Sequence, residues 1–450
     1  MTDRPGDAWR RATSALRSTL SSQVARQGYL SAFDQGVISL TNFSAALILA
    51  RAASPTEFGV YAVGFLLLHL GRAVQEGVII QPLAAIGAAL PEDDFRVFVS
   101  GAGAIQLVLA GAASAGAAVV GLAATAAGNT TAGPMVSALW FPLLSWQGQE
   151  FLRRVFYTRK SVPAALTNTV VASMARLAAL GILLASGQAT GRLGLTAIGW
   201  GAAAGCAVGL VQTRRLWSAR RARPVEVWNR SWGYARWVLG GTISNWVAVE
   251  VYPILTAGMI SFAAAGAYRA LQNVVAPVHA LLRAMDTYFT PRLAERFHRS
   301  GLDGARHMLR RMYALSGVPI LGYLAVSVVL SRPVLAAFYG NTYLAFAPGL
   351  GWMAGFYALW FAYWPLQSAL KAIQWTRPVF LANLLAAGAM FTLGVWAIAR
   401  WGVYGTIAGQ ALNALIVAVT LWWAWFRSSP RLPLTAEGGA ARPAGPPSAG

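Results

Sequence analysis

Apolar runs of roughly 20 residues, separated by short charged segments, constrain the fold of this 450-residue chain more than any other feature. A helix of that length is long enough to cross the hydrocarbon core of a membrane, which is about 30 Å thick. Lipid offers the backbone no hydrogen-bond partners, so each crossing segment has to satisfy its own peptide groups, as a helix does. Only 11% of the residues are charged, against about a quarter in a soluble domain. The sequence therefore predicts an all-α integral membrane protein.

Twelve of these runs can be placed as membrane-spanning helices. Their expected bounds are 29–50, 58–82, 97–126, 131–151, 161–186, 193–213, 235–260, 264–290, 312–336, 345–370, 376–399 and 402–426. The third run is rich in Ala and Gly rather than Leu. An error of one span would reverse the orientation of every later span, so the count needs an independent check.

The distribution of basic residues supplies that check, because loops on the cytoplasmic side of a membrane carry an excess of Lys and Arg. With twelve spans and the amino terminus inside, 28 of the 36 basic residues lie in inner segments. Those on the outer side are Arg51, Arg192, Arg400 and, near the outer end of the ninth span, Arg332. This asymmetry predicts twelve spans with both termini in the cytoplasm. It also explains the net charge of +21 through anionic membrane lipids, without a nucleic-acid partner.

The two halves of the chain resemble each other weakly. Gly59–Tyr61 begins the second predicted span as Gly266–Tyr268 begins the eighth, and Pro82 and Pro291 follow at the ends of these spans. Six spans per half is an even number, so both halves have the same orientation in the membrane. The pattern predicts two six-helix bundles related by a pseudo-two-fold axis along the membrane normal, with a cavity between them.

The expected domain organisation follows from these spans. Its segments are a cytoplasmic basic amphipathic segment at 1–28, an N-terminal six-helix bundle at 29–213, a cytoplasmic basic linker at 214–234, a C-terminal six-helix bundle at 235–426 and a disordered cytoplasmic tail at 427–450. Within the first bundle, Gly201, Gly205 and Gly209 share one helix face, which predicts close packing against a neighbouring helix.

The run Leu49–Val63 (LARAASPTEFGVYAV) resembles the first-loop signature of polysaccharide biosynthesis (Wzx-type) flippases. Stretches that agree with the pattern of the same family are Gly266–Glu295, Val334–Tyr343 and Tyr404–Gly409. The family belongs to the multidrug/oligosaccharidyl-lipid/polysaccharide exporter superfamily. The resemblance implies a multi-pass protein of the bacterial inner membrane that moves an undecaprenyl-diphosphate-linked oligosaccharide outward by alternating access, for cell-surface or exo-polysaccharide biosynthesis. It also implies a glycan polymerase and glycosyltransferases of the same pathway as partners.

Ionisable side chains inside the predicted spans are candidate site residues, because a charge in hydrocarbon is costly unless it faces a polar cavity or a partner. An arginine can hold the oxygens of a diphosphate through its planar guanidinium group. The residues expected to bind such a head group are Arg72, Arg269, Arg283, Gln272 and Asn273. Carboxylates in a partly dry cavity have a raised proton affinity. Those expected to couple transport to a proton or sodium gradient are Asp34, Glu76, Glu250 and Asp286.

Two of these arginines have a purely structural alternative. Arg72 and Glu76 are spaced i, i+4, and Arg283 and Asp286 are spaced i, i+3. Either pair could neutralise itself on one helix face without contacting a substrate.

Two other functions stay open. A drug/cation antiporter of the same fold would favour a net acidic cavity, whereas three in-span arginines favour an anionic ligand. A membrane-embedded glycan polymerase or ligase would carry a sizeable charged outer loop, and the expected outer loops are short. The sequence shows no phosphate-binding glycine loop, HExxH motif or supported Ser/His/Asp arrangement, so neither an enzyme, a metal site nor a cofactor is expected.

Overall fold

The computed structural model describes residues 23–217, 223–373 and 375–428, and every element in these ranges is a helix. Residues 1–22 of the predicted amphipathic segment and residues 429–450 of the predicted tail lie outside the described residues. The helices of the first part of the chain are α2 (Gln23–Ala52), α3 (Pro55–Gln75), the π-helix η1 (Glu76–Ile80), α4 (Gln81–Ala85), the 3₁₀ helix η2 (Gly87–Ala89), α5 (Glu92–Ala126), α6 (Ala132–Ser137), α7 (Trp140–Thr158), α8 (Val162–Ala185), α9 (Gly191–Thr213) and α10 (Pro224–Met259). Those of the second part are α11 (Phe262–Val275), α12 (Pro277–Val329), α13 (Ser331–Tyr339), η4 (Leu344–Phe346), α14 (Gly349–Ala372), α15 (Arg377–Ala389), the π-helix η5 (Met390–Gly394) and α16 (Val395–Ser428).

Seven helical stretches among the described residues are long and apolar enough to cross a membrane by length and composition. The last of them, Arg377–Arg427, contains both of the final two predicted spans, which are separated by a kink at Gly402. The other predicted spans lie on α6 with the first part of α7, on α10, on α11 with the first part of α12, and on α14. Polar or aromatic side chains lower the hydropathy of α7, α10 and α14, and α11, with 14 residues, is too short to cross a membrane by itself.

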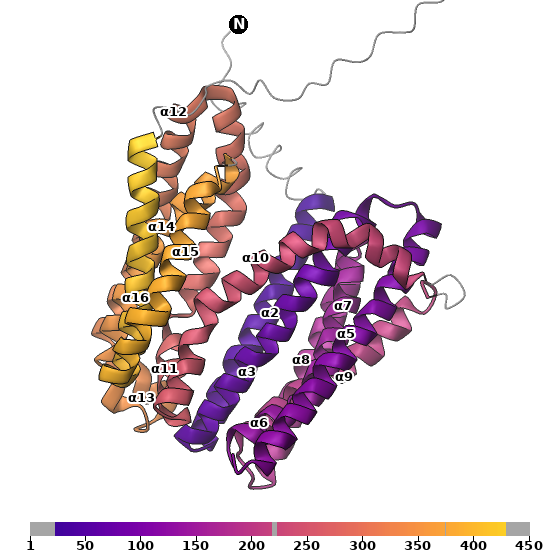
Figure 1. The fold of residues 1–450 in the computed structure, drawn as a ribbon, viewed down its shortest axis with the longest axis horizontal. Helices are drawn as coiled ribbons and strands as arrows, with labels where there is room; N and C mark the ends of the chain where they lie inside the picture. Colours follow the sequence, from indigo (N-terminus) through magenta and orange to yellow (C-terminus); the bar gives the residue numbers. More distant parts are fainter. Residues whose placement is uncertain (1–22, 218–222, 374, 429–450) are drawn as a thin grey trace, which may run out of the picture. The chain divides into compact units, whose positions relative to one another are not determined.

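Local sequence explains where several helices begin and turn. Ser54 lies just before α3, its hydroxyl accepts a hydrogen bond from the Glu57 N–H at 3.3 Å, and Pro55 occupies the first helical turn. The long helix α12 turns back at Ser300–Gly301 (Figure 1), where Gly301 has a φ of 59° and a ψ of −149° that favour glycine. The predicted inner loop 291–311 is therefore a helical hairpin.

Two helices end at residues other than the ends of the predicted spans. The fourth predicted span ends at residue 151, whereas α7 continues to Thr158 and includes the buried Arg153, which the sequence placed in a loop. The ninth predicted span runs to residue 336, but α12 ends at Val329 and the short α13 begins at Ser331.

The described residues form two compact units. The first comprises the chain up to Asn273 together with Leu335–Leu344, and the second comprises Val274–Val334 with Ala345 onward. This division follows from which residues lie close together in space, and it falls within α11. The division predicted at 214–234 rests instead on the internal repeat of the sequence. The predicted domain bounds stay a prediction.

In the first unit, α7 packs against α5, α8 and α9, and α3 packs against α9 and α10 (Figure 1). The predicted glycine face of α9 is confirmed. A Cβ at Gly201 would lie 2.6 Å from the Ala172 carbonyl oxygen of α8, and one at Gly209 would lie 2.9 Å from the Asn168 side chain. The side chain of Asn168 donates a hydrogen bond to the Gly205 carbonyl at 2.6 Å, so this close approach is also a polar contact.

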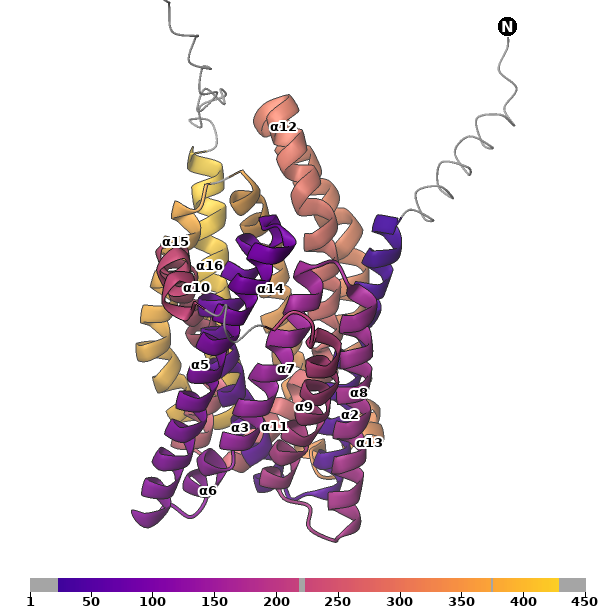
Figure 2. The same ribbon diagram turned by 90° about the vertical axis from the view of Figure 1, so that its right-hand side faces the viewer.

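In the second unit, α14 packs against both α12 and α16 (Figure 2). The core of this unit joins side chains from both parts of α12 with side chains from α14, α15 and α16. Its largest buried members include Phe289, Met308, Leu366, Leu421 and Trp425.

Candidate functional site

Helix α7 carries an unusual number of buried polar side chains for a membrane-embedded helix. Gln147, Gln149, Glu150 and Arg153 are all 8% exposed or less. Buried polar groups are costly unless they are paired, so each of them has to find partners on neighbouring helices. The polar face of α7 is therefore the framework on which the candidate site is built.

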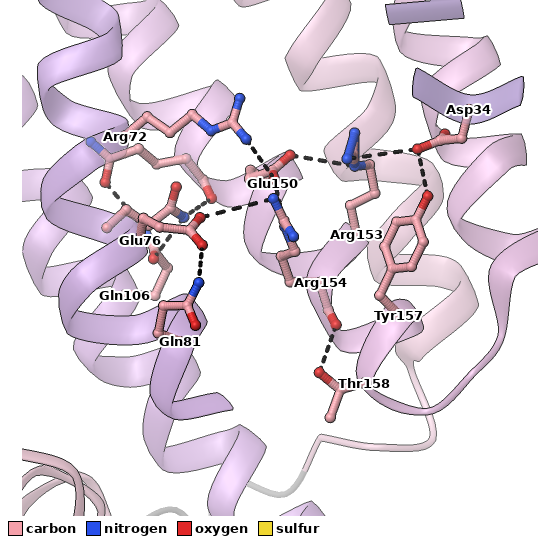
Figure 3. A network of polar contacts seen from close by, with 12 residues as sticks. Asp34, Arg72, Glu76, Gln81, Gln106, Glu150, Arg153, Arg154, Tyr157 and Thr158 are labelled. Atoms are coloured by element: carbon pink, nitrogen blue, oxygen red, sulfur yellow. Dashed lines mark hydrogen bonds and ion pairs between the residues drawn. The ribbon is translucent and has the colours of Figure 1, made fainter. Parts of the chain in front are cut away.

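Glu150 is the centre of an ion-pair network (Figure 3). Its Oε1 accepts a hydrogen bond from Nε of Arg154 at 2.8 Å and lies 3.6 Å from Nη2 of Arg72 on α3. Its Oε2 lies 3.4 Å from Nε of Arg153. With its side chain only 5% exposed, Glu150 depends on these three guanidinium groups to remain charged in the protein interior.

Asp34 of α2 extends the network on the far side of Arg153 (Figure 3). Its side chain is fully buried, its Oδ2 accepts a hydrogen bond from the Tyr157 hydroxyl at 2.7 Å, and Nη2 of Arg153 lies 3.6 Å away. Arg153 thus bridges Asp34 and Glu150. Within the described ranges, Oδ1 of Asp34 has no hydrogen-bond partner.

Glu76 closes the other end of the network, at the first residue of the π-helix η1. Its carboxylate accepts a hydrogen bond from Nε2 of Gln81 at 2.7 Å and lies 3.9 Å from Nη2 of Arg154. The intrahelical pairing of Arg72 with Glu76 is therefore wrong as an account of these two residues. Both have their ionic partners on α7, because α7 offers a buried carboxylate to Arg72 and a guanidinium group to Glu76.

The network is balanced in formal charge. It contains the three arginines Arg72, Arg153 and Arg154 and the three carboxylates Asp34, Glu76 and Glu150. The cation that solvent reaches most easily is Arg72, whose side chain is 36% exposed, whereas that of Arg153 is 5% exposed. Arg72 is also held less closely to Glu150, at 3.6 Å, than Arg154 is, at 2.8 Å.

Buried amides continue the polar track beside the ion pairs. Nε2 of Gln75 donates hydrogen bonds to Oε1 of Gln106 at 2.9 Å and to the Gln147 carbonyl at 2.6 Å. Nε2 of Gln106 in turn donates to Oε1 of Gln147 at 3.3 Å. These contacts join α3, α5 and α7 by hydrogen bonds in the interior of the first unit.

Three predicted head-group residues lie on α11, also in the first unit. Nη1 of Arg269 donates a hydrogen bond to Oε1 of Gln272 at 2.6 Å, and its guanidinium carbon lies 5.7 Å from the centre of the Phe65 ring. Nδ2 of Asn273 donates to the Tyr339 hydroxyl at 3.4 Å. Among the residues that the structure describes, Arg269 has no carboxylate partner.

The remaining predicted site residues are spread over other elements. Arg283 and Asp286 lie on α12 in the second unit, where Arg283 is exposed and Asp286 accepts a hydrogen bond from the Thr290 hydroxyl at 2.7 Å. Glu250 is half-buried on α10. The structure thus joins Asp34, Arg72 and Glu76 in one network, and groups the three α11 residues separately.

Sequence reasoning missed the residues of α7 that hold the network together. Glu150 lay inside a predicted span, and its spacing of i, i+3 and i, i+4 to Arg153 and Arg154 was the available signal. Both arginines were assigned to an inner loop by the charge rule, although they belong to the helix. In the described part of the chain, no group of three or more His, Cys, Asp or Glu side chains is arranged to hold a metal ion.

No protein-family model and no curated protein matches the chain by sequence. Solved structures, however, resemble it over most of its length. A multidrug resistance MATE family transporter of the MOP superfamily, in an inward-facing conformation, matches 87% of this chain and 94% of its own with a TM-score of 0.67 at 12% identity. The lipid II flippase MurJ matches 88% of this chain and 87% of its own with a TM-score of 0.60 at 12% identity.

A MOP superfamily transporter from Pyrococcus furiosus also matches, over 91% of this chain and 96% of its own, with a TM-score of 0.60 at 12% identity. At these identities the likeness establishes the fold. The predicted class, an all-α membrane protein of twelve transmembrane helices in two pseudo-two-fold related bundles, is confirmed.

Proposed function

We propose that this protein is a flippase of the multidrug/oligosaccharidyl-lipid/polysaccharide exporter superfamily that translocates a lipid-linked diphosphate oligosaccharide across the bacterial inner membrane by alternating access. The fold supports a transporter, because the solved structures that resemble the chain include MATE transporters and the lipid II flippase MurJ. Within that fold, the sign of charge presented to the substrate separates the candidate functions.

The observation that carries the proposal is the setting of Arg269. This guanidinium lies within a predicted span, is half-buried, and has a neutral amide and an aromatic ring as its partners. A cation at membrane depth is costly unless it meets an anion or water, so such a residue favours an anionic ligand. Arg176 also has neutral partners, Asn42 and Tyr61, but it is only 8% exposed and is packed inside the bundle. Arg269 is the more accessible of the two.

Arg72 and Arg283 add to this argument. Arg72 is partly exposed and lies 3.6 Å from a carboxylate that Arg154 holds more closely, and Arg283 is exposed on α12. The planar guanidinium group of an arginine can donate hydrogen bonds to two oxygens of a diphosphate at once. A cationic drug would instead be repelled by the positive charge of this group. Gln272 holds the Arg269 guanidinium in place, and Asn273 is the neutral donor beside it.

Ion coupling is assigned to the carboxylates. Asp34 combines complete burial with an oxygen that lacks a hydrogen-bond donor among the described residues, so a proton or a sodium ion would satisfy it. Glu76, at 22% exposure, is the more accessible carboxylate of the same network. Glu250 and Asp286 complete the proposed set.

A drug/cation antiporter is the second candidate, because MATE transporters share the fold. For the Pyrococcus furiosus transporter, reversed polarity of the binding pocket suggests a different function, so pocket charge is a useful discriminator within this fold. A glycan polymerase or ligase has less support, because the fold resembles transporters. The proposal includes a lipid-linked sugar as the substrate and the glycosyltransferases and polymerase of the same pathway as partners. It also includes a cytoplasmic location for both termini.

The test is binding of a short prenyl diphosphate to the purified protein in detergent. Arg269→Ala is expected to weaken binding about 10-fold or more, because a charge-assisted hydrogen bond to phosphate contributes about 1.5–3 kcal/mol. Arg269→Lys should lie between the two, since it keeps the charge and loses the fork. The control is Arg400→Ala, which removes an exposed arginine of an outer segment. Unchanged affinity in Arg269→Ala would overturn the head-group role.

A further inference from the structure

Helix α14 of the second unit carries a row of aromatic rings along one face, the residues Phe356, Trp360 and Trp364, here named the aromatic ladder. The three are spaced four residues apart, so each lies about one helical turn from the next. The rings of Phe356 and Trp360 are stacked at 6.3 Å and 3°, and those of Trp360 and Trp364 meet edge to face at 5.2 Å and 82°. Each member is half-buried, so part of its surface is open to a ligand.

The depth of the ladder is not the usual one for membrane tryptophans. Tryptophan gathers at the two membrane–water interfaces, where its indole N–H reaches water. Trp360 lies in the middle of the predicted span 345–370, and the ladder continues on both sides of it. An interfacial anchoring role therefore does not account for these rings.

Contacts with α12 show which surface the ladder borders. The His279 ring lies edge-on to Trp360 at 4.6 Å, and its Nε2 is 2.9 Å from the Tyr357 hydroxyl. Arg283 is four residues after His279, on the same face of α12, and is exposed within the predicted span. An exposed guanidinium at that depth requires a polar environment rather than hydrocarbon. The ladder therefore borders the part of α12 that carries His279 and the exposed Arg283, which requires polar surroundings in a membrane.

We infer that the aromatic ladder is a sugar-binding surface, on which Trp360 packs against the apolar face of a pyranose ring of the transported glycan. The C–H bonds of such a ring carry slight positive charge and are attracted to the negative face of an indole, while the sugar hydroxyls stay in the hydrated space. The neighbouring Arg283 would hold the diphosphate to which that sugar is attached. This inference rests on the proposed function and identifies the part of the site that recognises sugar rather than phosphate.

The test compares two probes on the same preparation, a short prenyl diphosphate and the same prenyl diphosphate carrying one N-acetylglucosamine. Trp360→Ala is expected to weaken binding of the sugar-bearing probe about 3- to 10-fold, the scale of one aromatic contact, and to leave the bare probe unchanged. Trp360→Phe should keep the affinity for both probes within about twofold, because a ring remains. The ratio of the two affinities does not depend on how much of the preparation is folded.

The matched control is Trp396→Ala, which removes a tryptophan of the same unit that is 57% exposed and contacts Trp401 rather than the ladder. An unchanged affinity ratio in Trp360→Ala, or an equal loss for both probes, would overturn the sugar-binding role while leaving the proposed flippase in place. If the wild-type protein binds neither probe, the proposed function fails and the inference fails with it.

Discussion

Replacing Arg153 by methionine removes the guanidinium that, among the described residues, bridges the two most deeply buried carboxylates of the ion network. Its side chain is 5% exposed, between Asp34 at 3.6 Å and Glu150 at 3.4 Å. Methionine has a similar length and fills much of the space, so the change acts chiefly on charge. The two carboxylates are not affected equally, because Glu150 keeps Arg154 at 2.8 Å and Arg72 at 3.6 Å.

Asp34 therefore bears most of the cost. Without Arg153, its remaining partner among the described residues is the Tyr157 hydroxyl, which donates a hydrogen bond but carries no charge. Removing one member of a buried ion pair costs about 3–5 kcal/mol of stability, because the other charge is left uncompensated. We expect Arg153→Met to fall in this range. Arg153→Met combined with Asp34→Asn should recover at least about half of the loss, since no buried charge is then unpaired.

The loss of stability is measured by thermal unfolding of the purified protein in detergent. The fraction of protein that stays monodisperse after heating gives the Tm of each variant. The expected order of Tm is wild type, then the double variant, then Arg153→Met. Additive losses, with the double variant less stable than either single variant, would refute the assignment of Arg153 as the counter-ion of Asp34.

Two further predictions concern packing and hydrogen bonding. Gly59→Ala should lower the Tm markedly, because the new Cβ would lie 1.7 Å from the Phe262 carbonyl oxygen and force α3 and α11 apart. The control Gly322→Ala, whose Cβ would meet no atom within 4 Å, should leave the Tm unchanged. Equal Tm values for the two variants would contradict the close contact between α3 and α11. Tyr157→Phe should lower the stability of the protein by about 1–3 kcal/mol, because the buried Asp34 carboxylate loses a hydrogen-bond donor. If the same loss of stability persists when Asp34 is also replaced by Asn, that reason is contradicted.

The helices could be predicted from the sequence because burying charged groups in lipid is costly. The sequence therefore alternates between apolar runs of about 20 residues and short charged segments. All twelve predicted spans fall on helices, although α7, α10 and α14 are not apolar enough to be found by composition alone. They were placed from their apolar runs, and the distribution of basic residues between inner and outer segments then supported the count. The turn of α12 at Ser300–Gly301 was out of reach, since the helix continues on both sides of a loop that reads as charged and polar.

The candidate site was predicted only in part, because ion pairs form between residues that are distant in sequence. Arg72 and Glu76 are spaced for a local pair, yet both have their ionic partners on α7. Arg153 was assigned to a loop because the charge rule counts basic residues without regard to ion pairing, and its partner Asp34 lies on another helix. Only tertiary structure shows that these charges are balanced, and that Arg269 differs from them in having neutral partners.

Transport by the reconstituted wild-type protein tests the central claim most directly. Proteoliposomes would carry a fluorescent prenyl-diphosphate-linked N-acetylglucosamine, and a membrane-impermeant quencher would report how fast the probe exchanges between leaflets. The account predicts faster exchange than in protein-free liposomes, with inhibition by unlabelled prenyl-diphosphate-linked sugar and none by the cation ethidium. Exchange no faster than in protein-free liposomes, together with ethidium uptake by the same proteoliposomes, would contradict it and favour a cation exporter.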